Sequence, residues 1–262
     1  MKSLLTVCLL LISTPSIASA QHSGKRHPSL TRVQIKEAER RLSGIGYWTG
    51  AVDGRLDPAT QSALIAFQKW EGRPITGQFT LAELEAIRNS APPKARETGY
   101  AHVEVDVDRQ VLLIVSDEGG VKILPVSTGS GKEFVAEGQT SIAYTPRGRF
   151  IVYDKVAGWE KGEFRSMYYS NYISGGVAIH GYPSVPTQPA SHGCIRIPIF
   201  AAREVSTLLK LGTIVLVYDK VSFVSAKDWV SNPKLKQAAV LSGAFAYETD
   251  FSKRKSRQHR GD

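Results

Sequence analysis

The period of the apolar residues changes at the proline pair Pro92-Pro93, and this change limits the possible folds more than any other feature. Before the pair, apolar residues recur at helical spacing. After it, valines alternate with polar residues, which is typical of half-buried β-strands. The sequence therefore predicts an α+β multidomain fold, with a small three-helix domain at residues 30–90, a linker at 91–99 and a mainly β domain at 100–220.

Start signals divide the first domain into short helices. They are two capping boxes and one aspartate before a proline, namely Thr31 with Gln34, Thr80 with Glu83, and Asp57 before Pro58. Each signal is followed by apolar residues at helical spacing, and glycines interrupt the pattern at residues 44–46, 50–54 and 72.

In the second domain, runs rich in β-branched residues indicate strands at residues 103–107, 111–115, 121–126, 150–153, 177–180 and 213–218. Tight turns separate the first three runs, so we expect an antiparallel meander there. Residues 200–211 have the one good helical period of this domain. Residues 221–262 form a C-terminal extension with a basic tail.

Residues 1–20 have the pattern of a signal peptide: a basic start, an apolar run at 4–12, and Ala18-Ser19-Ala20 as the cleavage site. A membrane anchor needs about 20 apolar residues, and this run is about half that length. We therefore expect export and cleavage. Cys8 leaves with the signal, so Cys194 is the single cysteine of the mature chain and has no disulfide partner within it.

Cys194 lies in the segment Ser191-His192-Gly193-Cys194-Ile195-Arg196, shortly after a second histidine, His180. A free thiol has a pKa of about 8.5 and attacks well only as the thiolate, so an imidazole must take its proton. His180 and His192 both qualify. His192 would share a face with Cys194 on an extended strand, but this adjacency alone does not decide between them.

The neighbours of Cys194 suit the same chemistry. Gly193 lets backbone N–H groups approach a tetrahedral oxyanion, and the guanidinium of Arg196 can form paired hydrogen bonds with a carboxylate or the developing charge. Arg196 could equally be an ordinary surface arginine. Ser191 is expected to bond the local backbone rather than act as a second nucleophile.

Residues 100–219 resemble the L,D-transpeptidase (YkuD-like) catalytic domain, an exported bacterial family that remodels peptidoglycan. Four pieces carry the resemblance: DVDRQVLL at 106–113, PVSTG at 125–129, TPRGRF at 145–150, and His180-Gly181 with SHGCIR at 191–196. Residues 30–90 resemble the three-helix peptidoglycan-binding domain through LSGIGY at 42–47, GAVDG at 50–54, PAT at 58–60 and AFQ at 66–68. Glu39 departs from that family's frequent glutamine.

The resemblance implies that Cys194 forms a thioester with a tetrapeptide stem and passes the stem to an amine acceptor. It assigns the base to His180, with its ring oriented by a backbone carbonyl. The motif also makes Gly181 and Ser191 candidates for substrate contact. The aromatic stretch at 150–180 resembles the family's lid, which makes Tyr168 and Tyr169 candidates for the same role.

Two other functions stay open: a cysteine-dependent hydrolase or carboxypeptidase that uses water, and a non-catalytic wall-binding adaptor. Expected partners are peptidoglycan stems and glycan, with a wall-anchored protein as a further possible acceptor. We expect the helical domain to serve retention on the wall, so that a chain beginning near Glu97 still acylates Cys194.

The formal net charge is +9, from 33 basic and 24 acidic residues, which favours anionic surfaces. Export makes nucleic acid an unfavoured partner. The expected location is the periplasm or the extracytoplasmic cell wall of a bacterium. The basic run at 253–260 reads either as a solvated end or as an electrostatic tether. The sequence contains no cluster of cysteine, histidine and carboxylate residues that suggests a metal, and no phosphate-binding loop, so no cofactor is expected.

Overall fold

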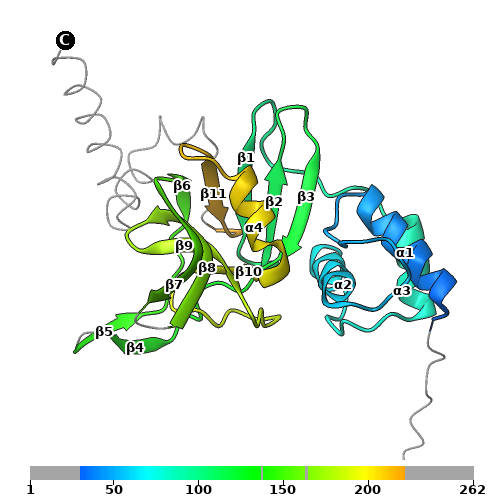
Figure 1. The fold of residues 1–262 in the computed structure, drawn as a ribbon, viewed down its shortest axis with the longest axis horizontal. Coiled ribbons are helices and arrows are strands. Elements are labelled where there is room, and N and C mark those ends of the chain that lie inside the picture. The colour runs from blue at the N-terminus through cyan, green and yellow to red at the C-terminus, as the bar shows by residue number, and fades with distance from the viewer. Residues whose placement is uncertain (1–29, 137, 163–164, 222–262) are drawn as a thin grey trace, which may run out of the picture.

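The computed structural model describes residues 30–136, 138–162 and 165–221, and Figure 1 shows their arrangement. It confirms the α+β architecture: the three N-terminal helices pack together on one side of the molecule, and β-sheets with one further helix make up the rest. The signal segment, Phe164 of the lid and residues 222–262 lie outside the described residues. Export and the role of the basic tail therefore stay predictions.

The first domain contains α1 (Arg32–Gly44), α2 (Pro58–Trp70) and α3 (Leu81–Asn89), each beginning at its predicted signal. Thr31 and Gln34 form a complete capping box, and the Asp57 side chain accepts from the N–H of Thr60 at 2.7 Å. At α3 only half of the box forms. Thr80 caps the helix, but the Glu83 carboxylate pairs with Arg73 instead, at 3.1 Å.

Glu39 is fully buried between α1 and the start of α2. Its two carboxylate oxygens accept from the N–H of Gly54 at 2.7 Å and from the hydroxyl of Thr60 at 2.9 Å. Both donors would be costly to leave unpaired in this position. The carboxylate therefore ties the glycine-rich turn to the helical core.

One β-sheet follows the predicted meander. Its strands lie in the order β3-β2-β1-β11-β6, with bounds β1 (His102–Asp106), β2 (Val111–Val115), β3 (Val121–Pro125), β6 (Gly148–Ile151) and β11 (Ile214–Tyr218). β1, β2 and β3 pair antiparallel as expected, whereas β11 returns to pair parallel with β1. These strands supply one wall of the core of the β domain.

A second sheet supplies the opposite wall, with the order β10-β9-β8-β7. Its strands are β7 (Asp154–Gly162), β8 (Arg165–Ser174), β9 (Val177–Tyr182) and β10 (Ile195–Pro198), and a small separate hairpin joins β4 (Glu133–Ala136) to β5 (Gln139–Ile142). The helix α4 (Ile199–Leu208) ends three residues before the predicted end, because Leu209 has left the helical conformation. The stretch expected as a lid forms the long β7–β8 hairpin (Figure 1).

The two domains share a hydrophobic core. On β2, Leu112 points into the catalytic core, while Val111, Leu113 and Val115 point the other way and pack with the helices. This sheet is therefore covered on both faces, which explains why residues 111–115 are all apolar instead of alternating. The proline-containing segment between the domains connects two bodies in direct contact.

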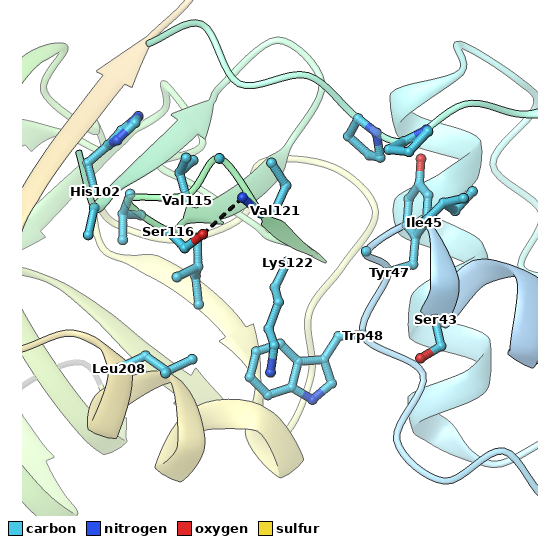
Figure 2. A pocket seen from close by; sticks show the side chains of 18 of the residues that line it. Ser43, Ile45, Tyr47, Trp48, His102, Val115, Ser116, Val121, Lys122 and Leu208 are labelled. Carbon is cyan, nitrogen blue, oxygen red and sulfur yellow. Dashed lines mark hydrogen bonds between the residues drawn. The ribbon is translucent and has the colours of Figure 1, made fainter. Parts of the chain in front are cut away.

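An interdomain groove of about 1000 Å³ lies beside this contact, between the loop after α1, the β2–β3 turn and α4. Figure 2 shows the ammonium of Lys122 over the indole of Trp48, with 4.8 Å between the nitrogen and the ring centroid. Cys194 and His180 do not line the groove. None of the described helices is long and apolar enough to cross a bilayer.

The shared core changes what truncation is expected to do. A chain beginning near Glu97 would expose the apolar side chains that β2 and β3 now bury against the helices, and each such side chain contributes about 1.5–3 kcal/mol. We expect this chain to lose several kcal/mol of unfolding free energy relative to the full chain. Urea unfolding checks this, and equal transition midpoints would contradict the shared core.

Candidate active site

The strand pair β9–β10 places the thiol and one imidazole on the same face. The parallel register sets Ile195 beside Ile179 and Arg196 beside His180, so Cys194 lies next to Ala178 at the mouth of the pair. Side chains alternate along a strand, and the two isoleucines point into the core. The side chains of His180 and Arg196 therefore project to the opposite face, from strands about 4.8 Å apart. The charges of Arg196 and Glu160 act on both the His180 imidazole and the Cys194 thiol, so the thiol lies near this face as well.

Residues 191–194 form a closed loop before β10. The Ser191 hydroxyl donates to the carbonyl of Cys194 at 2.6 Å and accepts from the N–H of Gly193 at 3.0 Å. Thr145 donates to the Gly193 carbonyl at 2.6 Å. Gly193 has φ +149°, and a Cβ there would lie 2.9 Å from the carbonyl oxygen of Tyr144, so only glycine fits.

These contacts change the roles expected for two loop residues. Ser191 is buried, and its hydroxyl is used within the loop, which makes it a loop-positioning residue, while its contact with substrate stays a prediction. The N–H of Gly193 points at Ser191 and not at an oxyanion. Among the residues considered for the oxyanion, the N–H of Cys194 itself is left as the backbone candidate.

Residues 126–130, which follow β3, form a supporting segment that binds this loop through backbone hydrogen bonds. The carbonyl of Thr128 accepts from the N–H groups of Ala190 and Ser191, both at 2.9 Å. Ser127 exchanges two backbone hydrogen bonds with Arg196, at 3.0 and 3.1 Å. The loop is therefore fixed on both sides of Cys194, which gives the PVSTG motif a structural role.

His180 is 3% exposed, and its Nδ1 lies 3.0 Å from the carbonyl oxygen of Gly181. A carbonyl only accepts, so Nδ1 carries the proton and Nε2 is free to act as a base. Burial lowers the pKa of His180 to about 4. This value already includes the hydrogen bond to Gly181 and the charge of Glu160, which raise the pKa, and the charge of Arg196, which lowers it, so the imidazole is neutral at pH 7.

The Cys194 thiol is also neutral at rest. Its Sγ is partly buried and lies 3.7 Å from the carbonyl oxygen of Gly176. Burial raises the pKa of Cys194, and the negative charge of Glu160 raises it further, while the Ala178 N–H and the Arg196 guanidinium oppose the rise. A neutral thiol beside a neutral imidazole is suited to general-base attack rather than to a preformed ion pair.

His192 lies apart from this arrangement. Its side chain is exposed, and its ring packs on Phe134 of β4 with 4.7 Å between centroids. The same-face argument for His192 assumed an extended strand, but β10 begins only at Ile195. The bend at Gly193 therefore removes the relation between His192 and Cys194 that sequence spacing suggested.

The remaining predicted contacts divide between the core and the lid hairpin. Gly181 faces α4, where a Cβ would lie 2.5 Å from that of Ala202, so it allows close packing there, and its carbonyl orients His180; its contact with substrate stays a prediction. Tyr168 and Tyr169 are half-buried at a bulge in β8, with 4.7 Å between their ring centroids. Tyr168 also packs on the exposed Trp159, at 4.8 Å.

Arg196 is half-buried, and its guanidinium lies 4.4 Å from the ring centroid of Tyr182. Tyr182 in turn contacts the His180 ring edge to face, with 6.0 Å between centroids. A cation over an aromatic face is attracted by the negative face of the ring. Its contact with Tyr182 and its partial burial therefore fix the Arg196 side chain beside His180, unlike an ordinary surface arginine.

Sequence reasoning missed one acidic residue near the thiol. Glu160 of β7 accepts from the Tyr172 hydroxyl at 2.9 Å, and its other oxygen, Oε2, is buried with no hydrogen-bond donor among the described residues. Burial, assisted by Glu160, raises the pKa of Tyr172. The only available sequence signal was the position of Glu160 in the aromatic stretch, because its pairing depends on the hairpin register.

Replacing Glu160 by glutamine is expected to lower the pKa of Cys194, because a negative charge that opposes the thiolate is removed. The pH midpoint for alkylation of Cys194 by iodoacetamide should therefore move down relative to wild type. Glu118→Gln, at the exposed β2–β3 turn, is the matched control and should leave the midpoint unchanged. A midpoint in Glu160→Gln that is unchanged or raised would contradict a direct effect of the Glu160 charge on the thiol.

Comparison with known proteins bears on both domains. Residues 100–217 match the L,D-transpeptidase catalytic domain family, and residues 31–87 match a peptidoglycan binding domain family. No curated protein matches the chain.

Within residues 30–136, 138–162 and 165–221, no group of three or more histidine, cysteine and carboxylate side chains could hold a metal ion.

Solved structures show the same relationship. An L,D-transpeptidase from Xylanimonas cellulosilytica is 35% identical with a TM-score of 0.68, over 73% of this chain and 97% of that one. An L,D-transpeptidase from Stackebrandtia nassauensis is 21% identical with a TM-score of 0.43, over 70% of this chain and 90% of that one. On the first of these matches, together with its catalytic-domain match, the chain belongs to the L,D-transpeptidase family.

Proposed function

We propose that this enzyme acylates Cys194 with a peptidoglycan tetrapeptide stem. The neutral Nε2 of His180 takes the thiol proton while Sγ attacks the carbonyl carbon of the third stem residue. The tetrahedral intermediate then collapses as His180 returns the proton to the nitrogen of the terminal D-alanine, which leaves. A thioester remains on Cys194. The observation that carries this proposal is the neutral His180, held by the Gly181 carbonyl on the same face as the thiol.

Charge around the thiol supports the acylation step. The Cys194 N–H and the Arg196 guanidinium are the candidate donors for the developing oxyanion. Arg196 is a cation on this face, and its charge partly offsets the rise that burial causes in the pKa of Cys194. The aromatic residues of the β7–β8 hairpin, Tyr168 and Tyr169 among them, can shield the thioester from water and contact the stem.

In the second step an amine of another stem attacks the thioester and gives its proton to His180, and the thiolate leaves and is reprotonated. The product is a cross-link between third residues. Water in place of the amine would make the enzyme a carboxypeptidase, and an amine of a wall-anchored protein would attach that protein. We favour the amine of a second stem because the catalytic domain belongs to a transpeptidase family.

We infer that the helical domain retains the enzyme on peptidoglycan, and that the chain works outside the cytoplasm, in the periplasm or cell wall. The peptidoglycan-binding match at residues 31–87 supports retention. The signal-like pattern at residues 1–20 supports export. A non-catalytic adaptor is disfavoured, because a buried base beside a partly buried thiol has no use in passive binding.

Product analysis tests the proposal. Purified full chain is incubated with a tetrapeptide muropeptide, and the products are separated and identified by mass spectrometry. We expect release of D-alanine together with a dimer joined through third residues. Tripeptide monomers without any dimer would identify a hydrolase, and an unchanged muropeptide with unlabelled Cys194 would favour the adaptor.

A further inference from the structure

Lys69 reaches from the helical domain into the catalytic domain. It lies in the last turn of α2 and is 4% exposed. Its ammonium donates to two backbone carbonyls of the catalytic domain, that of Gln110 at 3.1 Å and that of Val126 at 3.0 Å. Burial lowers the pKa of Lys69 to about 7, and no carboxylate pairs with it among the ion pairs of the described residues.

A buried lysine without a counter-ion is unfavourable unless its hydrogen bonds are satisfied. The hydrogen bonds to these two carbonyls therefore contribute more to stability than a contact on the surface would. They are also joined to each other, because the N–H of Val126 donates to the carbonyl of Gln110 at 2.9 Å. Gln110 has a positive φ of 56°, which is uncommon outside glycine. Lys69 thus closes a strained turn onto the end of β3.

Gln110 continues the connection through its side chain. Its Nε2 donates to the hydroxyl of Thr128 at 2.7 Å, and its Oε1 accepts from the N–H of Thr128 at 2.9 Å. Thr128 is the centre of the supporting segment, and its carbonyl accepts from Ala190 and Ser191. The path from the helical domain to the catalytic loop therefore consists of hydrogen bonds of 2.7–3.1 Å that run through the buried residues Lys69, Gln110, Thr128 and Ser191.

We propose that Lys69 is a positioning residue for catalysis, and that the peptidoglycan-binding domain thereby fixes the loop that carries Cys194. Lys69 bonds the carbonyls of Gln110 and of Val126, which begins the supporting segment, and Gln110 bonds Thr128 within that segment. The segment in turn bonds the loop that carries Cys194 and so sets the position of the thiol relative to His180. The helical domain is then part of the catalytic architecture as well as a wall anchor. The proposal rests on the proposed function only in using acylation of Cys194 as one readout.

The test uses the full chain with Lys69→Met, which keeps the buried stem and removes the donors. The control is Lys122→Met, a lysine at the same domain boundary that lies over Trp48 (Figure 2) and pairs with Glu204. At a temperature where all variants are folded, we expect Lys69→Met to lower the rate constant for Cys194 acylation by a carbapenem about tenfold or more. Lys122→Met should stay within about twofold of wild type.

Two further measurements separate positioning from plain stability. Hydrogen exchange at the amides of Ala190 and Ser191 should become faster in Lys69→Met and remain unchanged in Lys122→Met. Thr128→Val removes one of the two hydrogen bonds between Gln110 and Thr128, one step later on the same path, so combining it with Lys69→Met should cost less than the sum of the single effects. Additive losses would place the two residues on separate paths and overturn the proposal.

A wild-type acylation rate in Lys69→Met would also overturn the proposal, as would equal losses in Lys69→Met and Lys122→Met or slower acylation without faster exchange. The exchange experiment needs no substrate. If the wild-type enzyme is not acylated at Cys194, the proposed function fails, and the exchange comparison still decides whether Lys69 positions the loop.

Discussion

Replacing Cys194 by alanine is expected to abolish turnover of a tetrapeptide muropeptide. The thiol is the group that forms the covalent bond, and removing it leaves His180 without a nucleophile to activate. Because the side chain is small and partly buried, the fold and its thermal midpoint should change little. Intact-mass spectrometry after carbapenem treatment should show an adduct on the wild-type enzyme and none on Cys194→Ala.

An adduct on Cys194→Ala would show that another residue is the nucleophile. Ser191 is the obvious alternative by position. Its hydroxyl is already engaged with the Cys194 carbonyl and the Gly193 N–H, so it is not free to attack. Peptide mapping of any such adduct would decide the matter.

Replacing His180 by alanine is expected to lower the rate of Cys194 acylation by about a hundredfold or more, the usual range for loss of a general base. His192→Ala is the matched variant and should cost much less, because its ring is exposed against Phe134. A severe loss in His192→Ala with a mild loss in His180→Ala would reverse the base assignment.

The pH dependence of acylation checks the same assignment. With a pKa of about 4, His180 stays neutral through the weakly acidic range. Wild-type acylation should therefore persist down to about pH 5 and fall as the pH approaches 4, where the imidazole becomes protonated and can no longer accept the thiol proton. In His180→Ala this acidic limb should be absent.

Local signals in the sequence were sufficient to predict the elements that depend on interactions between residues close in the chain. The caps at Thr31, Asp57 and Thr80 placed the three helix starts, since each side chain bonds the backbone within three residues. The alternation of β1 and the turns beside β2 likewise indicated the meander. The Cys-His motif indicated the nucleophile and left the base open between two histidines.

The long lid hairpin was not predicted as strands, because a register shift between Val156 and Trp159 interrupts the alternation of β7. Gly158, with φ +77°, lies at this irregularity. The pairing of Glu160 with Tyr172 depends on the resulting register, so no local pattern could reveal it.

Contacts between segments that are distant in the chain account for the other structural features that the sequence did not predict. Residues 111–115 are apolar on both faces, and this pattern was itself a sign that something covers the outer face of the sheet. Which segment covers it depends on the tertiary fold. The position of Lys69 against Gln110 and Val126 is hidden for the same reason, since an isolated lysine in a helix usually faces solvent.

A single-turnover chase tests the account's central claim most directly. The wild-type enzyme is acylated with a tetrapeptide donor, freed of excess donor, and mixed with a stem that carries the acceptor amine. We predict a Cys194 adduct with the mass of the stem without its terminal D-alanine, which disappears at the rate at which the cross-linked dimer forms. An adduct that persists in the presence of the amine, or a dimer that forms without any adduct, would contradict a transpeptidase that works through a Cys194 thioester.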